Sequence, residues 1–117
     1  MASKHDLSLE IIETGNPKLF RVSDTSFYSS DIPVECATLE ILSPGFNNPA
    51  VLENVLPGFN YMVNACTLGQ QTVGCSSTNF GTIADGVYVV RYSVSPNDKV
   101  FVQYNFLRMP GGFTLYY

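Results

Sequence analysis

The chain of 117 residues has no tryptophan, one histidine and only six lysine and arginine residues. The basic residues are scattered, so no basic stripe exists to neutralise phosphates, and nucleic-acid binding is disfavoured. No run approaches the roughly 20 apolar residues that cross a bilayer, so no membrane partner is expected. The start, MASKHDLSLE, lacks the apolar centre of a secretory signal. The sequence therefore predicts a protein made and kept inside a cell, or packed into an assembly formed there.

Charged residues are also scarce, at 14%, where an ordinary globular domain has roughly 25%. The net charge is −4 and 45% of the residues are hydrophobic, which is typical of a folded chain rather than a disordered one. The length suits one domain with a real core. A weakly charged surface that is rich in aromatic residues is expected where partners cover much of a protein.

The three cysteines, Cys36, Cys66 and Cys75, are an odd number, which does not indicate a disulfide framework. Cys66 and Cys75 flank the segment TLGQQTVG and could form a bridge or join another ligand at a metal. A zinc site needs four ligands, and the one histidine, His5, falls in an expected N-terminal tail of residues 1–6. Buried free thiols are the preferred interpretation, and no metal or other cofactor is expected.

The clearest positive signal is a β-hairpin. Residues 87–94 alternate, and every second side chain is apolar or aromatic: Tyr88, Val90, Tyr92 and Val94. This period of two predicts a half-buried strand. The turn Ser95-Pro96-Asn97-Asp98 follows, and the return strand begins at Val100.

The entry to this hairpin, Asp85-Gly86-Val87-Tyr88, resembles the start of strand F in immunoglobulin-like and fibronectin-like sandwiches. In those domains a tyrosine hydroxyl bonds back to upstream backbone and forms a tyrosine corner. We assign a structural corner to Asp85, Gly86 and Tyr88. The alternative is an ordinary Asp-Gly turn with Tyr88 as a core aromatic. Val90 stands where antibody-type domains carry a cysteine, so their inter-sheet disulfide is absent.

Shorter segments alternate in the same way, with turn residues between them. They cover residues 7–13, 18–22, 35–42, 51–56 and 60–67. Short strands with a turn signal every 8–12 residues are typical of an all-β sandwich, and no helix is expected. We predict a single immunoglobulin/fibronectin III-like antiparallel β-sandwich of about seven strands over residues 7–108.

Three aromatic features could act as contacts with a partner. Pro44-Gly45-Phe46-Asn47 recurs as Pro57-Gly58-Phe59-Asn60, and Pro-Gly is the natural centre of a type II turn. Phe46 and Phe59 are therefore either similar docking tips or anchors of two independent turns. Phe27 and Tyr28, in a polar loop, either plug the core or are offered to a partner.

The third feature is a C-terminal extension, residues 109–117, which begins with a Met-Pro-Gly-Gly break. Its apolar end would be an aggregation hazard if uncovered. It is expected to cover the edge of its own domain or another subunit, or to continue into further chain. The candidate interface residues here are Phe113, Leu115, Tyr116 and Tyr117.

Catalytic sets are missing from the sequence. It has no nucleophile elbow, no phosphate-binding glycine loop and no helical zinc pair. The ten carboxylates are expected to be surface charges and turn residues, and the loop aspartates lack calcium-loop spacing. We therefore expect a protein that is not an enzyme, with a small hydrolase as the weakest alternative.

Residues 9–12, 35–45 and 84–108 resemble small structural proteins of tailed bacteriophages, and most closely those of crAss-like phages of gut Bacteroides-type hosts. The matching motifs are CATLEI before Pro44-Gly45, then DGVY, RYSVSPND and YNFLR. The resemblance implies an immunoglobulin-like sandwich that serves in a head–tail connector, ring or tail. Relatives tend to continue into a helical tail after the last arginine, a pattern from which residues 109–117 depart.

The first functional hypothesis is thus a non-enzymatic virion structural subunit, made in the host cytoplasm. Its expected partners are other virion structural proteins and further copies of itself. The second hypothesis is a carbohydrate-binding or adhesion module, although tryptophan, the strongest residue for stacking on sugars, is absent.

Overall fold

The computed structural model describes residues 5–14, 18–31, 33–70, 82–95, 100–109 and 112–116. These residues form strands and no helix, so the prediction of an all-β fold is confirmed for them. The strands are β1 (Leu9–Glu13), β2 (Phe20–Asp24), β3 (Cys36–Leu42), β4 (Ala50–Glu53), β5 (Asn60–Val63), β6 (Gly86–Ser95), β7 (Val100–Met109) and β8 (Gly112–Tyr116). Within these ranges, no helix is long and apolar enough to cross a membrane.

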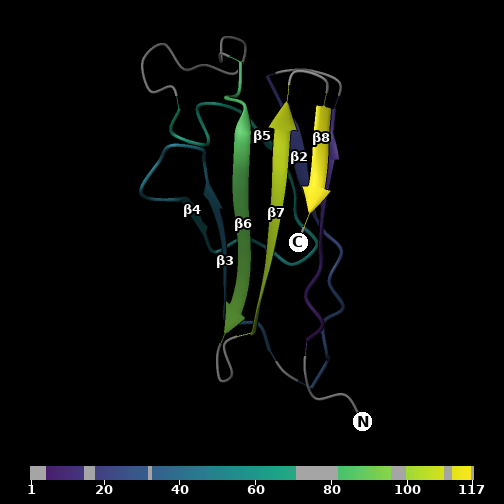
Figure 1. Cartoon of the computed structure of the whole chain (residues 1–117). Coiled ribbons are helices and arrows are strands. Elements are labelled where there is room, and N and C mark those ends of the chain that lie inside the picture. The colour runs from purple at the N-terminus through teal and green to yellow at the C-terminus, as the bar shows by residue number, and fades with distance from the viewer. Residues whose placement is uncertain are drawn as a thin grey trace.

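The strands make two antiparallel sheets, one behind the other (Figure 1). One sheet has three strands in the order β1-β2-β5, and the other has five in the order β4-β3-β6-β7-β8. The strands β1 to β7 agree with the prediction of about seven strands. The eighth, β8, pairs with β7 from Met109 opposite Gly112 to Asn105 opposite Tyr116. The C-terminal extension therefore covers the β7 edge of its own domain, which was one of the three alternatives.

The core lies between the sheets and is built from every second residue of the strands. On β3 the buried residues are Ala37, Leu39 and Ile41, and on β6 they are Tyr88, Val90, Tyr92 and Val94. Both sets are the apolar faces that the sequence predicts. Each fully buried large side chain contributes about 1.5–3 kcal/mol of hydrophobic stabilisation.

An aromatic group holds the two sheets together. The ring of Phe20 on β2 meets the ring of Phe106 on β7 edge to face, with centroids 5.3 Å apart. The rings of Phe106 and Tyr88 are stacked at 5.0 Å. Such pairs add about 0.5–1.5 kcal/mol beyond the area that they bury.

Strands β6 and β7 form the predicted hairpin, paired from Gly86 opposite Arg108 to Val94 opposite Val100. Its predicted turn lies, apart from Ser95, outside the described residues. The strand β3 pairs with the other side of β6, from Cys36 opposite Ser95 to Leu42 opposite Val89. The hairpin and β3 are thus the centre of the five-stranded sheet.

The predicted N-terminal boundary at residue 7 is wrong. The N–H of Asp6 donates to the carbonyl of Phe27, and the N–H of Phe27 donates back to the carbonyl of Asp6, both at 2.8 Å. The side chain of His5 is buried, and its Nδ1 accepts a hydrogen bond of 2.9 Å from the N–H of Ser29. These two residues belong to the fold because the loop before β3 supplies partners that lie about 20 residues away in the chain.

Candidate functional site

The outer face of the five-stranded sheet carries several exposed apolar side chains. Because side chains alternate along a strand, the residues between the buried ones point away from the core. Half of the large hydrophobic side chains that are exposed among the described residues lie on this outer face. They are Val51, Val87, Phe101 and Met109.

The pairing register brings together side chains from three strands at the middle of this face. Glu40 on β3 is opposite Arg91 on β6, and Arg91 is opposite Gln103 on β7. In the next row, Ser93 is opposite Phe101. These residues come from segments that lie up to 63 positions apart in the sequence (Glu40 to Gln103), and only the sheet makes them neighbours.

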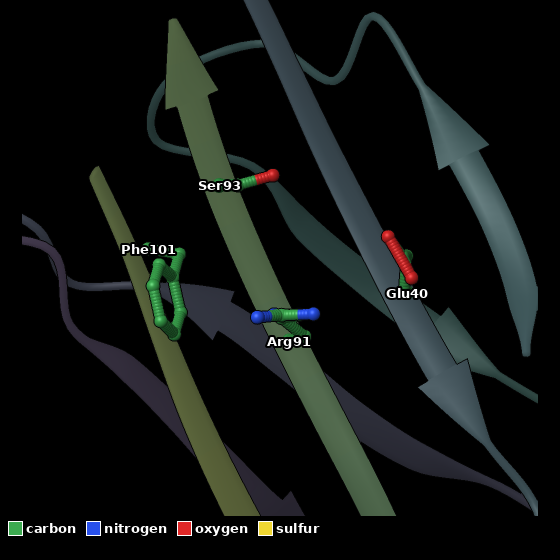
Figure 2. A pocket seen from close by; sticks show the side chains of 4 residues that line it. All are labelled: Glu40, Arg91, Ser93 and Phe101. Carbon is green, nitrogen blue, oxygen red and sulfur yellow. The ribbon is translucent and has the colours of Figure 1, made fainter. Parts of the chain in front are cut away.

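A hollow of about 310 Å³ opens among four of these side chains, Glu40, Arg91, Ser93 and Phe101 (Figure 2). The guanidinium carbon of Arg91 lies 4.5 Å from the centre of the Phe101 ring. This cation–π contact contributes about 0.5–1 kcal/mol at an exposed position. It also holds the long arginine side chain in one place, so that less entropy is lost when a partner binds.

The two charged side chains of the hollow, Glu40 and Arg91, form no ion pair within the described part of the chain. Arg108, by contrast, is paired with Asp85 at 2.8 Å. An outward guanidinium can bind a carboxylate through two hydrogen bonds, and an outward carboxylate can accept the reverse bond. The arrangement suits recognition of a surface that presents both charges. We find no acid–base pair in it that would indicate catalysis.

The residues assigned to the structural corner lie together at the start of β6. The hydroxyl of Tyr88 donates to the carbonyl of Ala84 at 2.5 Å, which is the upstream backbone bond that the motif predicts. Gly86 has a φ of +134°, and a Cβ there would lie 2.8 Å from two atoms of Pro44. Asp85 accepts from Arg108. The alternative of a plain core aromatic at position 88 does not describe this geometry.

Two corner residues were missed by the sequence reasoning. The Gln70 amide donates to the Tyr88 hydroxyl and accepts from the N–H of Ala84, both at 2.9 Å. The buried guanidinium of Arg108 donates to the carbonyl of Ile83 at 3.0 Å. Gln70 follows β5 and Arg108 is the last residue but one of β7, so no local pattern connects them to Tyr88.

A second polar cluster joins the two sheets around Asp24 at the end of β2. The carboxylate accepts hydrogen bonds from the hydroxyl of Tyr28, from the N–H of Ser26 at 2.9 Å and from the N–H of Gly58 at 2.9 Å. The hydroxyl oxygens of Tyr28 and Tyr92 are 2.5 Å apart. Tyr28 therefore closes the core, as one of the two alternatives predicts, whereas its neighbour Phe27 is exposed.

The electrostatics of this cluster favour a charged carboxylate and neutral phenols. Burial alone would raise the pKa of Asp24, but the hydrogen bonds from Ser26, Tyr28 and Gly58 outweigh burial and lower it. Burial raises the pKa of Tyr92 to about 12. Burial and the bond to Asp24 raise the pKa of Tyr28 still further. The cluster has a structural role, because its polar groups form hydrogen bonds with one another and so connect the two sheets.

The two Pro-Gly-Phe turns have the same backbone conformation, but their phenylalanine side chains have different roles. The N–H of Phe46 donates to the carbonyl of Ser43 and that of Phe59 to Leu56, both at 3.1 Å, with φ near +80° at both glycines. Phe46 is exposed at the surface. Phe59 is buried and stacks on Tyr61 with ring centroids 5.0 Å apart. The assignment of Phe59 to an interface is therefore wrong, because its ring is needed in the core.

The C-terminal candidates are placed only as backbone. Phe113, Leu115 and Tyr116 lie on β8, paired with β7, and Tyr117 lies outside the described residues. Their role in an interface remains a prediction.

The cysteines differ from the preferred interpretation of buried free thiols. Cys66 is disulfide-bonded, and Cys36 is free but exposed on β3. Cys75 lies outside the described residues. The prediction failed because an odd number of cysteines does not prevent one bridge. In the described ranges, no three histidine, cysteine or acidic residues come together as metal ligands would.

Comparison with known proteins gives no relative: the chain matches no protein family, no curated protein and no solved structure.

Proposed function

We propose that this chain is a non-enzymatic structural subunit of a tailed-phage virion that works by protein–protein assembly through the outer face of the five-stranded sheet. The observation that carries the proposal is the composition of that face. Phenylalanine, methionine and arginine are enriched at protein interfaces, and lysine and glutamate are depleted. The face presents Phe101, Met109 and Arg91, with Val51 and Val87 around them. It also carries two glutamates, Glu40 and Glu53, so the apolar and arginine side chains are the part of its composition that supports the proposal.

The geometry of Arg91 and Phe101 supports the same function. Interface energy is concentrated in a few aromatic and arginine residues near the centre of a contact. Arg91 lies on the central strand β6 and Phe101 near the start of the neighbouring strand β7, and their contact already holds the arginine in position. The low charge of the whole chain agrees with a protein whose surface is largely covered by partners.

We further propose that the sandwich is of the immunoglobulin/fibronectin III type. The order β1-β2-β5 corresponds to strands A-B-E of such domains, and β4-β3-β6-β7 to strands C′-C-F-G. The bond from Tyr88 to Ala84 at the start of β6 supports the assignment of β6 as strand F. Sandwiches of this type serve many functions, so the fold alone does not carry the functional proposal.

A carbohydrate-binding module is the second candidate, and the hollow is the observation that favours it. A carboxylate, a guanidinium, a hydroxyl and an aromatic ring converge there. Assembly is the better proposal because the Arg91 guanidinium already covers one face of the Phe101 ring, the surface on which a sugar would stack.

Mass spectrometry of purified phage particles tests the proposed function. We expect this chain in a fixed ratio to the portal and capsid proteins. A phage that carries Phe101→Ser should lose the chain from its particles. A phage that carries Met62→Ser should retain it, because Met62 is similarly exposed but lies on the three-stranded sheet. Absence of the wild-type chain from particles would overturn the proposal, and binding on a glycan array would then favour the second candidate.

A further inference from the structure

We propose that a second copy of this chain covers the outer face of the five-stranded sheet, packed face to face about a two-fold axis that runs between β3 and β6. This inference rests on the proposed function and names the partner for the same face. Its basis is the pattern of side chains in the rows of β3 and β6, the two strands beside the axis, which is complementary to itself.

The central row supplies the charge complementarity. Glu40 and Arg91 are direct cross-strand partners, one on each side of the proposed axis. Rotation about that axis exchanges β3 and β6, so Glu40 of one copy faces Arg91 of the other, and Arg91 faces Glu40. In a two-fold dimer each contact is made twice. One such row therefore gives two ion pairs across the interface, between groups that form no ion pair within the described part of one chain.

The neighbouring rows match in the same way. Leu42 is opposite Val89, and Thr38 is opposite Ser93. The rotation that pairs the charges therefore sets Leu42 against Val89 of the second copy, and Thr38 against Ser93. In these two rows apolar side chains meet apolar ones and hydroxyls meet hydroxyls.

One strand further out, the same rotation sets β4 against β7, with Val51 against Gln103 and Glu53 against Phe101. The complementarity therefore lies in the two strands beside the axis.

The three-stranded sheet lacks this property. On its outward rows, Glu10 is opposite Ser23, and Arg21 is opposite Ile12 and Met62. In the described part of that sheet, no acidic residue is the cross-strand partner of a basic one. A two-fold axis between its strands would bring no opposite charges together, so the pattern distinguishes one face of the sandwich from the other.

The size of the overlap suits a weak, reversible dimer. An axis between β3 and β6 sets β6 of one copy over β3 of the other and β7 over β4, so the overlap is limited by the 7 residues of β3 and the 4 residues of β4. With about 3.3 Å per residue and about 4.8 Å between strands, the overlap on both sides of the axis covers about 350 Å² in projection. Stable interfaces bury about 800 Å² on each partner. Sheets that pack face to face at about 10 Å are also a common arrangement.

Sedimentation velocity of the purified chain, from about 1 μM to about 1 mM, tests the inference. We expect a reversible dimer of the wild type. Glu40→Arg puts two arginines on the axis of each copy, and Arg91→Glu puts two glutamates there. Each variant alone should dissociate, with a dissociation constant at least about 100-fold higher, because like charges face each other. An equimolar mixture of the two variants should form a heterodimer within about tenfold of the wild-type affinity.

The mixture is decisive because its rescue requires opposite charges at both positions. The matched control, Glu10→Arg on β1, reverses one exposed charge on the other sheet and should leave the dimer unchanged. If circular dichroism shows that either charge-reversal variant does not fold, the neutral variants Glu40→Gln and Arg91→Gln are used instead. Each of them should raise the dissociation constant of the dimer about tenfold.

Three results would overturn the inference: a wild type that stays monomeric over the whole range, a dimer that survives both substitutions, or a mixture that stays monomeric although both variants fold. These results leave the proposed function standing if the chain is found in particles, where the same face would meet a different protein. A chain that dimerises through this face but is missing from particles would instead remove the proposed function alone.

Discussion

The hydroxyl of Tyr88 lies 2.5 Å from the carbonyl oxygen of Ala84, four residues earlier in the chain, and donates a hydrogen bond to it. The same hydroxyl accepts a bond from Gln70, and Tyr88 has no exposed surface. Burial raises the pKa of this phenol, which keeps it neutral and able to donate. The contact fixes the loop before β6, and with it the position of the central strand of the five-stranded sheet.

The first prediction concerns that contact. Tyr88→Phe leaves the Ala84 carbonyl and the Gln70 amide without their partner and should lower the free energy of unfolding by about 1–2 kcal/mol. Urea melts measure the change. The control is Tyr61→Phe, because the Tyr61 ring packs on Phe59 and its hydroxyl has no partner among the described residues. Equal stability of Tyr88→Phe and the wild type would show that the corner contributes nothing.

The second prediction concerns the stability of a substitution at Gly86. With a φ of +134° and Pro44 only 2.8 Å from the position of a Cβ, Gly86→Ala combines backbone strain with a steric overlap. It should destabilise the fold by about 3 kcal/mol. Gly58 has a φ of +80° and open space around it, so Gly58→Ala should cost only about 1 kcal/mol. Equal losses in thermal or urea melts would contradict the role of Pro44.

The third prediction separates the two Pro-Gly-Phe turns. Phe59→Ala removes a buried ring that meets Tyr61 and Tyr92, and it should cost about 3–5 kcal/mol. Phe46→Ala acts on an exposed ring and should change the stability by less than about 1 kcal/mol. Chemical denaturation of both variants measures the difference. A larger loss for Phe46→Ala would mean that the assignment of the two rings is reversed.

Asp24 makes the acid-stability prediction. Hydrogen bonds lower its pKa in the folded state below the ordinary value of 3.8. The stabilisation is therefore fully present above that ordinary value and is lost as the pH falls through the lower folded pKa. Asp24→Asn should be less stable than the wild type at pH 7, and the difference in the free energy of unfolding should become smaller below about pH 4. Urea midpoints across this range measure it. A gap that does not change with pH would exclude an electrostatic role.

The fifth prediction concerns the cysteines. Cys36 is free and exposed, so iodoacetamide should alkylate it in the native protein. Cys66 is disulfide-bonded and should react only after a reductant is added, even in denaturant. Peptide mapping by mass spectrometry distinguishes the two residues. Alkylation of Cys66 in denaturant without a reductant would show that the bridge does not form.

Local patterns in the sequence determined much of the architecture. The period of two marked the buried faces of β1, β3 and β6, because alternation depends only on the pleat of a single strand. Pro-Gly placed both turns, since only glycine adopts a positive φ without strain. The motif from Asp85 to Tyr88 predicted a bond over four residues, which is also a local property.

Only the tertiary structure decided which residues meet. The two turns have the same hydrogen bond and nearly the same glycine φ, yet Phe59 is buried and stacks on Tyr61 while Phe46 is exposed. His5 was drawn into the fold by a loop more than 20 residues away. Glu40, Arg91 and Phe101 became neighbours through the register of three strands. Register depends on how two sheets bury their apolar faces against each other, a long-range balance of free energy that no short stretch of sequence contains.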